Sequence, residues 1–282
     1  MAPTQRHRWL TLPDSFSSKR DQRLIDYVLD HARADFDARY PNIHFGPVVA
    51  LIAAYNEEGN IGEVLKAMPT LVGDLEVSTL VVVDGGTDGT ADVALDAGVT
   101  TCVLPVNLGQ GAALRLGYQL AATHGAGHVV TLDADGQNDP TELPAMLEPL
   151  LDDTADFVIA SRVLGDDQTT DRFRRAGVKL YAWILNSIAK QQLTDSSNGY
   201  RAFRIDVLKD ILPHLVQDQY QTAEVVITAS SRGWRITQQP TMWHPRASGF
   251  SKKGGNLVFG VNYARVILIT WARVTLGNRT RR

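Results

Sequence analysis

The sequence predicts a single α/β domain built on a mostly parallel, twisted β-sheet with helices on both faces. Apolar runs of strand length alternate with segments of helical periodicity. Most of these runs are apolar throughout, as strands covered on both faces of a parallel sheet are. The chain of 282 residues is long enough for a core of this size. The crossover rule then brings the carboxyl ends of the strands to one edge of the sheet, where open α/β sheets bind ligands.

The first half of the chain supplies most of this pattern. Residues 21–37 carry apolar side chains at helical spacing and predict a surface helix. The predicted strands that follow are 48–55, 78–84, 100–106, 128–135 and 155–162. The predicted helices between them are 60–71, 90–98, 111–125 and 139–151, the last with Asp139 as N-cap and Pro140 in its first turn.

The second half is less regular. The predicted elements are a long helix over 173–191, a polar loop over 194–204, a helix over 220–233, a strand over 234–244 and a basic loop over 245–253. Together these elements divide the chain into three parts. We expect an N-terminal arm and helix over 1–47, one catalytic domain over 48–253, and an amphipathic helix with a basic tail over 254–282.

Composition argues against several functional classes. The formal net charge is -3, so no strong positive field draws the protein to nucleic acid. The single cysteine, Cys102, excludes a disulfide within the chain and fits a reducing, cytoplasmic compartment. The first 20 residues lack the apolar core of a signal peptide. The most apolar stretch, 257–277, is interrupted by Asn262, Arg265 and Arg273 and is too polar to span a membrane.

Two aspartates end the strand predicted over 128–135. Asp133 and Asp135 are one residue apart, with Gln137 close by. Such close carboxylates repel each other, and a divalent cation would offset that repulsion. Mg²⁺ and Mn²⁺ take oxygen ligands and often bridge carboxylates to substrate phosphates. The alternative is a solvated Asp-rich turn that caps the next helix, but the position at the ligand edge of the sheet favours a metal site. The chain has no P-loop, and no Rossmann fingerprint follows its first strand.

Several motifs together resemble the family 2 glycosyltransferases of the GT-A fold, most of all their polyprenyl-phosphate (dolichol-phosphate) mannosyltransferase branch. The matching segments are AAYNEEGNI (53–61), VVVDGGTDGT (81–90), NLGQGAALRLG (107–117), LDADGQNDP (132–140), IASR (159–162), TDSSNGYRAFR (194–204) and RASGFSK (246–252). The resemblance implies a nucleotide-sugar donor, Mg²⁺ or Mn²⁺ as cofactor, and inverting transfer of a hexose from a GDP- or UDP-sugar to a polyprenyl phosphate.

The resemblance also implies roles for individual residues. The nucleoside of the donor is expected at Ala53, Tyr55, Glu57 and Asp84, and the metal and diphosphate at Asp133, Ala134, Asp135 and Gln137. Arg162 is expected to approach the phosphates or the acceptor's charge, with a structural carboxylate as its alternative partner. Arg246, Ser251 and Lys252 are expected to lie in a loop that closes over the donor. Asp195 and Glu224 match acceptor-side positions, where either is a catalytic base or orients Arg201 or Arg204; His244 is open between packing and a phosphate or metal contact.

Three positions depart from the family pattern. Val83 replaces the first of two aspartates, Gly86 replaces a serine, and Gln110 replaces a basic residue. These positions border the expected donor pocket and leave the nucleotide base open. They also leave open that the protein is a non-catalytic module that binds nucleotide sugars. A second alternative is a transferase with a hydroxyl acceptor, which would need a general base. A nucleotidyltransferase also needs carboxylates and a metal, but its Gly-rich basic loop is absent after the first strand.

A lipid acceptor predicts peripheral contact with the cytoplasmic face of a membrane. Residues 257–277 are apolar and aromatic with interspersed arginines, and the basic tail GNRTRR follows, as expected for an interfacial helix near anionic lipid. A C-terminal helix packed on the domain is one alternative. A homodimer interface is the other.

Overall fold

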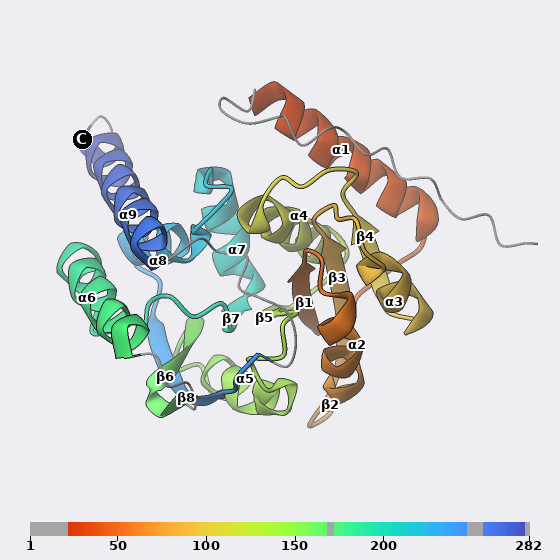
Figure 1. The fold of residues 1–282 in the computed structure, drawn as a ribbon, viewed down its shortest axis with the longest axis horizontal. Helices are drawn as coiled ribbons and strands as arrows, with labels where there is room; N and C mark the ends of the chain where they lie inside the picture. Colours follow the sequence, from red (N-terminus) through yellow and green to blue (C-terminus); the bar gives the residue numbers. More distant parts are fainter. Residues whose placement is uncertain (1–21, 168–171, 247–255, 280–282) are drawn as a thin grey trace, which may run out of the picture.

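The computed structural model describes residues 22–167, 172–246 and 256–279. The N-terminal arm, Ser251 and Lys252 lie outside these ranges. Within them, eight strands form one sheet (Figure 1). The strands are β1 Val48–Ala54, β2 Leu71–Val72, β3 Leu75–Val83, β4 Thr100–Val103, β5 His128–Asp133, β6 Phe157–Asp167, β7 Arg201–Arg204 and β8 Ile236–Trp243. The helices are α1 Gln22–Arg39, α2 Glu58–Ala67, α3 Thr90–Asp96, α4 Gln110–Thr123, α5 Leu143–Leu151, α6 Arg172–Ala189, α7 Ile205–Ile211, α8 Gln221–Ser231 and α9 Asn256–Arg279, with short 3-10 turns η1 Pro140–Glu142 and η2 Leu212–His214.

The sheet is mostly parallel, as predicted. Its order is β2-β3-β1-β5-β7-β6-β8, and β4 also pairs with β3. Strand β1 lies parallel between β3 and β5, with Val48 opposite Val77 and His128. Strand β7 is antiparallel to both of its neighbours, β5 and β6, and β2 forms a short antiparallel pair with β3. The carboxyl ends of β1, β3 and β5 therefore meet at one edge.

Apolar side chains fill both faces of the sheet. In β1, Val49 and Leu51 belong to the core beneath α1, α4, α7 and α8, whereas Ala50 and Ile52 belong to the core beneath α2 and α5. Strands buried on both sides have to be apolar at every position, which explains the continuous apolar runs of the sequence. Helix α2 ends at Ala67, earlier than predicted, because Pro69 disfavours helical geometry at Met68, which is extended (φ -66°, ψ 124°).

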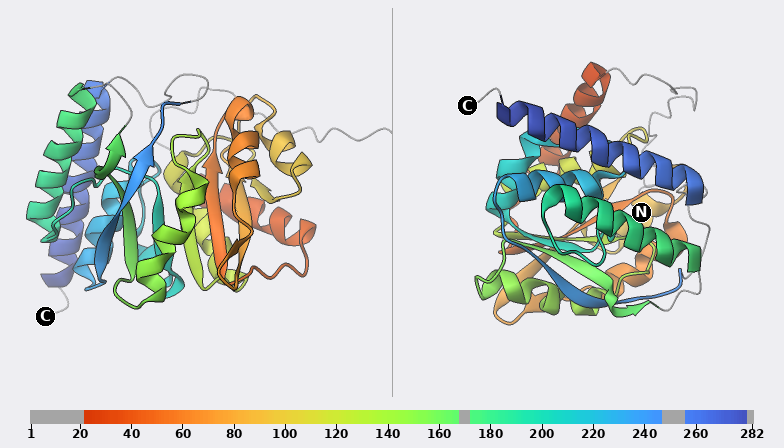
Figure 2. Two further views of the ribbon diagram at one scale, coloured as in Figure 1. Left: turned by 90° about the horizontal axis from the view of Figure 1, so that it is seen from below. Right: turned by 90° about the vertical axis from the view of Figure 1, so that its left-hand side faces the viewer.

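Helices α6 and α9 form an outer layer over α8, at the opposite end of the molecule from α1 (Figure 2). Tyr181 of α6 and Tyr263 of α9 pack edge to face with ring centroids 5.0 Å apart. Among the described residues, no helix, α9 included, is both long and apolar enough to cross a membrane.

Helix α1 covers β4 at the other end. Cys102 of β4 is 2% exposed, and its Sγ lies 3.7 Å from the carbonyl oxygen of Ala32 in α1. Burial raises the pKa of the Cys102 thiol to about 12. The cysteine is thus a core residue, as its apolar sequence context indicates.

Candidate active site

A pocket opens at the shared carboxyl edge of β1, β3 and β5. We call it the acidic pocket. Its lining residues are Ala53, Ala54, Tyr55, Glu57, Asp84, Asn107, Gln110, Asp133, Ala134, Asp135, Gln219 and Arg246. Every predicted donor-binding residue within the described ranges is therefore found in one place. A second pocket, the adjoining pocket, shares Gln110, Asp133 and Gln219 with the first.

Charge in the acidic pocket is unbalanced. Glu57, Asp84, Asp133 and Asp135 supply four carboxylates, while Arg246 is the one basic side chain among the described residues that line the pocket. Carboxylates this close together raise one another's free energy unless cations or hydrogen-bond donors compensate them. The contacts of each carboxylate show how far this compensation goes.

Asp84 is compensated by backbone amides. Its side chain is buried, and its two oxygens accept hydrogen bonds from the amides of Leu108 at 2.7 Å and Gly109 at 2.8 Å. Gly109 has φ +105°, a conformation that side chains rarely adopt. Asp84 thus fixes the loop before α4, which forms one wall of the pocket. Its expected contact with the base or ribose remains a prediction.

Asp133 is held by Gln110. The Nε2 of Gln110 donates to Oδ1 of Asp133 at 2.8 Å. Gly199 approaches the same carboxylate so closely that an added Cβ would lie 2.9 Å from Oδ2. The departure from a basic residue at position 110 therefore places a neutral hydrogen-bond donor, instead of a cation, on this aspartate.

Asp135 and Glu57 share one arginine. Arg246 donates from Nη2 to Oδ2 of Asp135 at 2.6 Å and from Nη1 to Oε1 of Glu57 at 3.0 Å. The segment that carries Arg246 is anchored by Gln137, whose Nε2 donates to the carbonyl oxygen of His244 at 3.2 Å and whose own carbonyl accepts from the His244 amide at 2.9 Å. In these contacts Gln137 and His244 position the segment after β8, which for His244 fits the packing alternative. Gln137 does not line the acidic pocket, and its metal-binding role remains a prediction.

The residues of the acidic pocket fit a divalent cation that is only partly ligated by protein. Among the described residues, no three His, Cys, Asp or Glu side chains converge into a complete metal site. Asp133 and Asp135 nevertheless offer carboxylate oxygens in a pocket with excess negative charge. Mg²⁺ sites of this kind use one or two carboxylates and complete their coordination with water and substrate phosphates.

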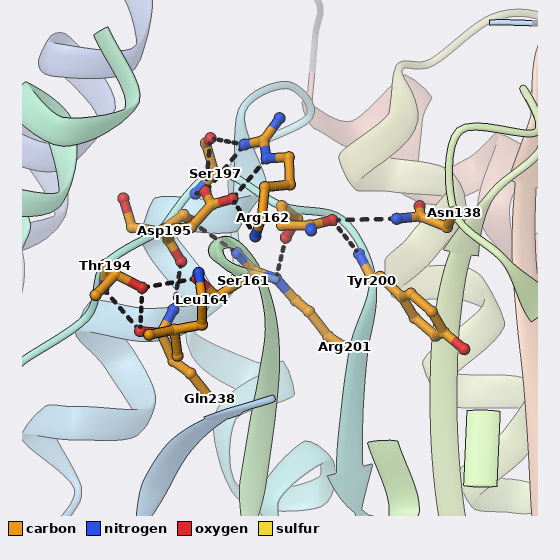
Figure 3. Close-up of polar contacts among 12 residues, drawn as sticks. Asn138, Ser161, Arg162, Leu164, Thr194, Asp195, Ser197, Tyr200, Arg201 and Gln238 are labelled. Atoms are coloured by element: carbon orange, nitrogen blue, oxygen red, sulfur yellow. Dashed lines mark hydrogen bonds and ion pairs between the residues drawn. The ribbon is translucent and has the colours of Figure 1, made fainter. Parts of the chain in front are cut away.

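Arg162 and Asp195 form a buried ion pair (Figure 3). Nε and Nη2 of Arg162 donate to the two oxygens of Asp195 at 2.6 and 2.9 Å, and Nη2 also donates to Ser197 Oγ at 2.8 Å. The guanidinium stacks over the Trp243 ring, 4.6 Å from its centroid. Burial alone would raise the pKa of Asp195, but Arg162 and the Ser197 contacts outweigh it, so the pKa lies below its ordinary value.

The pairing of Arg162 with Asp195, a structural carboxylate, is the alternative to its expected contact with the phosphates or the acceptor, and that contact remains a prediction. Neither residue lines the acidic pocket or the adjoining pocket. Asp195 orients Arg162 rather than Arg201 or Arg204, and its loop is further held by Gln238, which donates to the Asp195 carbonyl at 2.9 Å. The pair shapes the 194–198 loop, and Ser197 of that loop does line the adjoining pocket.

Glu224 is also fully engaged in structural contacts. Its side chain is 0% exposed and accepts hydrogen bonds from the amides of Val216 and Gln217, both at 3.0 Å. Arg273 of α9 donates to the same carboxylate at 2.6 Å. Glu224 therefore joins α8, the loop before it and α9. These contacts do not favour a role as general base.

Sequence reasoning missed residues that arrive from the loop before α8. Gln219 lines both pockets, and Tyr220 has φ +58°, a left-handed conformation that is strained for an aromatic residue. No local pattern marks these residues, because their role depends on Arg115, which donates to the Gln217 carbonyl and to Asp218, both at 2.7 Å. That link joins α4 to the loop across about a hundred residues of sequence.

Comparisons with known proteins show which family and which relatives the chain resembles. Residues 49–212 match the family described as glycosyl transferase family 2. The chain is 30% identical to an undecaprenyl-phosphate mannosyltransferase of Micrococcus luteus, over 75% of this chain and 89% of that protein. It is also 30% identical to a dolichyl-phosphate hexose transferase of Haloferax volcanii, over 72% of this chain and 85% of that protein.

A solved structure shows the same fold. Glucosyl-3-phosphoglycerate synthase of Mycobacterium tuberculosis, crystallised with Mn²⁺, UDP and glucosyl-3-phosphoglycerate, superposes with a TM-score of 0.65 at 20% identity. The match covers 91% of this chain and 87% of that chain. The predicted GT-A architecture is thereby confirmed.

Proposed function

The chain belongs to glycosyl transferase family 2, and from that membership we propose that it transfers a hexose from a GDP- or UDP-sugar to a polyprenyl phosphate, with inversion of the anomeric centre. The observation that carries the proposal is the acidic pocket. It gathers Glu57, Asp84, Asp133 and Asp135 with Arg246 at the ligand-binding edge of the sheet.

In this proposal different residues of the acidic pocket bind different parts of the donor. Tyr55, 37% exposed, and Glu57 lie beside the nucleoside. Asp133 and Asp135 hold Mg²⁺ or Mn²⁺, which would supply positive charge for the departing nucleoside diphosphate. Arg246 adds a guanidinium, whose planar donors suit phosphate oxygens. Lys252 is proposed to join it, although it lies outside the described residues.

The acceptor follows from the relatives and from the state of two carboxylates. Two relatives are named for transfer to undecaprenyl or dolichyl phosphate. A phosphate acceptor is already an anion and needs no general base, whereas a hydroxyl acceptor does. Asp195 is bound to Arg162, and Glu224 to two amides and Arg273, so neither candidate base is presented to a pocket. This favours the anionic acceptor.

Activity with a labelled donor tests the proposal. The full chain is incubated with radiolabelled GDP- or UDP-hexoses, Mn²⁺ or Mg²⁺, and a polyprenyl phosphate. We expect label to enter organic solvent only when the lipid and the metal are both present. Label transferred to a water-soluble product would favour the hydroxyl acceptor. Neither transfer nor donor hydrolysis with any sugar would favour the non-catalytic binding module.

A lipid acceptor also requires a surface that can lie at a membrane. We propose that this surface is the exposed face of α6 and α9, which pack together at one end of the molecule (Figure 2). Its exposed large apolar residues are Leu180, Trp183, Val261, Leu268, Ile269, Trp271 and Leu276. Lys179 and Arg265 are exposed on the same two helices. Aromatic and basic residues together suit an anionic membrane interface, here proposed as the cytoplasmic face.

A further inference from the structure

The contact between Arg246 and two pocket carboxylates has consequences for cation binding. The side chain of Arg246 is 20% exposed, and those of Glu57 and Asp135 are each 10% exposed. Bridged in this way, the guanidinium supplies positive charge at the carboxylate that is expected to hold the metal. Arg246 therefore balances the negative charge of Asp135 without a metal ion.

Both oxygens of Asp135 already accept a hydrogen bond from this chain. Oδ1 accepts from the backbone amide of Gln137 at 3.1 Å, and Oδ2 accepts from Arg246 at 2.6 Å. A divalent cation at Oδ2 would lie next to a guanidinium at a largely buried carboxylate, where like charges repel more strongly than in bulk water. The two cations therefore compete for one carboxylate.

We propose that Arg246 is the resident counter-ion of the acidic pocket, and that a divalent cation binds Asp135 tightly only after the diphosphate has drawn Arg246 away. The inference rests on the metal-dependent function proposed above. Gln137 anchors the chain at His244, two residues before Arg246, so the guanidinium can exchange a carboxylate for a phosphate without a large change of backbone. The diphosphate gives Arg246 a new bidentate partner, and the metal takes the vacated carboxylate.

This exchange makes the binding of metal and of nucleotide cooperative. Without nucleotide, the cation has to displace Arg246 from the carboxylates, which takes free energy from metal binding. With a nucleoside diphosphate bound, Arg246 has already left Asp135, and the metal binds more tightly. By linkage, the metal raises the affinity for the diphosphate by the same factor. If Arg246 instead stayed on the two carboxylates when the diphosphate binds, its removal would raise Mn²⁺ affinity by the same factor with and without nucleotide.

Mn²⁺ titrations of the full chain test the exchange without an activity assay. Free Mn²⁺ is measured by electron paramagnetic resonance for wild type, Arg246→Gln and Arg246→Lys, each with and without GDP or UDP. We expect Arg246→Gln to bind Mn²⁺ alone about tenfold more tightly than wild type and to lose most of the coupling to nucleotide. Arg246→Lys should lie between them, because an ammonium cannot bridge two carboxylates as a guanidinium does.

A matched control lies far from the pocket. Arg235 also bridges two carboxylates, with Nη2 donating to Asp153 at 2.6 Å and to Asp156 at 2.8 Å. Arg235→Gln is expected to bind Mn²⁺ as wild type does.

The outcomes separate this inference from the function on which it rests. Mn²⁺ binding that Arg246→Gln leaves unchanged or weakens overturns the exchange and leaves the proposed function standing. Failure of every variant to bind Mn²⁺, with or without nucleotide, overturns the metal-dependent function as well. Circular dichroism shows which variants fold, and if Arg246→Gln does not, tighter Mn²⁺ binding by Arg246→Lys supports the exchange and unchanged binding overturns it.

Discussion

At the scale of single residues, the Arg162–Asp195 pair is where a small change has the largest expected effect on stability. The side chains are 6% and 0% exposed, so neither charge can be hydrated if its partner is lost. We expect Asp195→Asn to lower the free energy of unfolding by about 3 kcal/mol, because it leaves a buried guanidinium uncompensated. Urea unfolding measures the change, and a loss below about 1 kcal/mol would contradict the buried pairing.

The same pair predicts how stability depends on pH. The pKa of Asp195 is depressed in the folded protein, so the unfolded chain binds the proton more tightly. Ionised Asp195 therefore contributes its full share of the free energy of unfolding at pH values above the pKa of aspartate in the unfolded chain, about 3.9. This contribution is lost as the pH falls through the lower pKa that Asp195 has in the folded protein. Urea unfolding of wild type from pH 6 downwards should show this loss. In Asp195→Asn, the free energy of unfolding should depend less on pH over this range. The same pH dependence in wild type and Asp195→Asn would contradict a depressed pKa for Asp195.

Asp135 gives the residue-scale test of the metal. We expect Mn²⁺ with GDP or UDP to raise the melting temperature of wild type and not that of Asp135→Ala, because ligand binding stabilises only a native state that still holds the ligand. Asp96→Ala, at an exposed position in α3, is the matched control and should keep the shift. An unchanged shift in Asp135→Ala would place the cation elsewhere.

At the scale of elements, the continuous apolar strands could be predicted and the polar ones could not. Strands β1 and β5 and the last four residues of β3 are buried on both faces, and their sequences are largely apolar there. The first part of β3, which starts at Leu75, is more polar and more exposed. Strand β7, Arg201–Arg204, begins with a buried arginine whose charge is satisfied by the carbonyls of Ser196, Asn198 and Thr222, so no apolar pattern marks it. Strand β6 continues past Arg162 beyond an irregularity, because its end pairs with Met242 and Trp243 of β8.

The candidate site was predictable to a similar extent. The meeting of three strand-end loops follows from the crossover rule alone. The pairings within the site do not, because Gln110–Asp133, Arg246–Asp135 and Glu224–Arg273 join residues 23, 111 and 49 positions apart. Sequence spacing identifies residue types that suit a chemistry, whereas the partner that each one takes depends on tertiary packing.

Helix α9 offers an element-scale prediction. Arg273 is the link from this helix to the buried carboxylate of Glu224, which is otherwise held by two amides. We expect Arg273→Met to lower the free energy of unfolding by about 1–3 kcal/mol, the cost of leaving a buried charged acceptor short of a donor. Arg265→Met, exposed on the same helix, should change it little. Equal effects of the two variants would contradict this role for Arg273.

At the scale of the whole molecule, the α6–α9 face predicts binding to anionic vesicles. Trp183 and Trp271 are 67% and 46% exposed there, whereas Tyr27, 67% exposed, lies on α1 at the other end. We expect sedimentation with phosphatidylglycerol vesicles that falls with added salt. The double variant Trp183→Ser/Trp271→Ser should weaken it about tenfold, and Tyr27→Ser should not. A stable dimer in light scattering with no vesicle binding would assign this face to a second copy instead.

The reactivity of Cys102, the single thiol of the chain, can measure how often the structure opens beneath α1. A thiolate, and not a neutral thiol, attacks electrophilic reagents such as maleimide. At Cys102 the raised pKa keeps the thiol protonated and helix α1 covers it. Maleimide labelling at neutral pH should therefore be slow until α1 lifts from β4 or the whole chain opens. The rate of Cys102 modification would then measure how often this end of the molecule opens, without an introduced tag or dye.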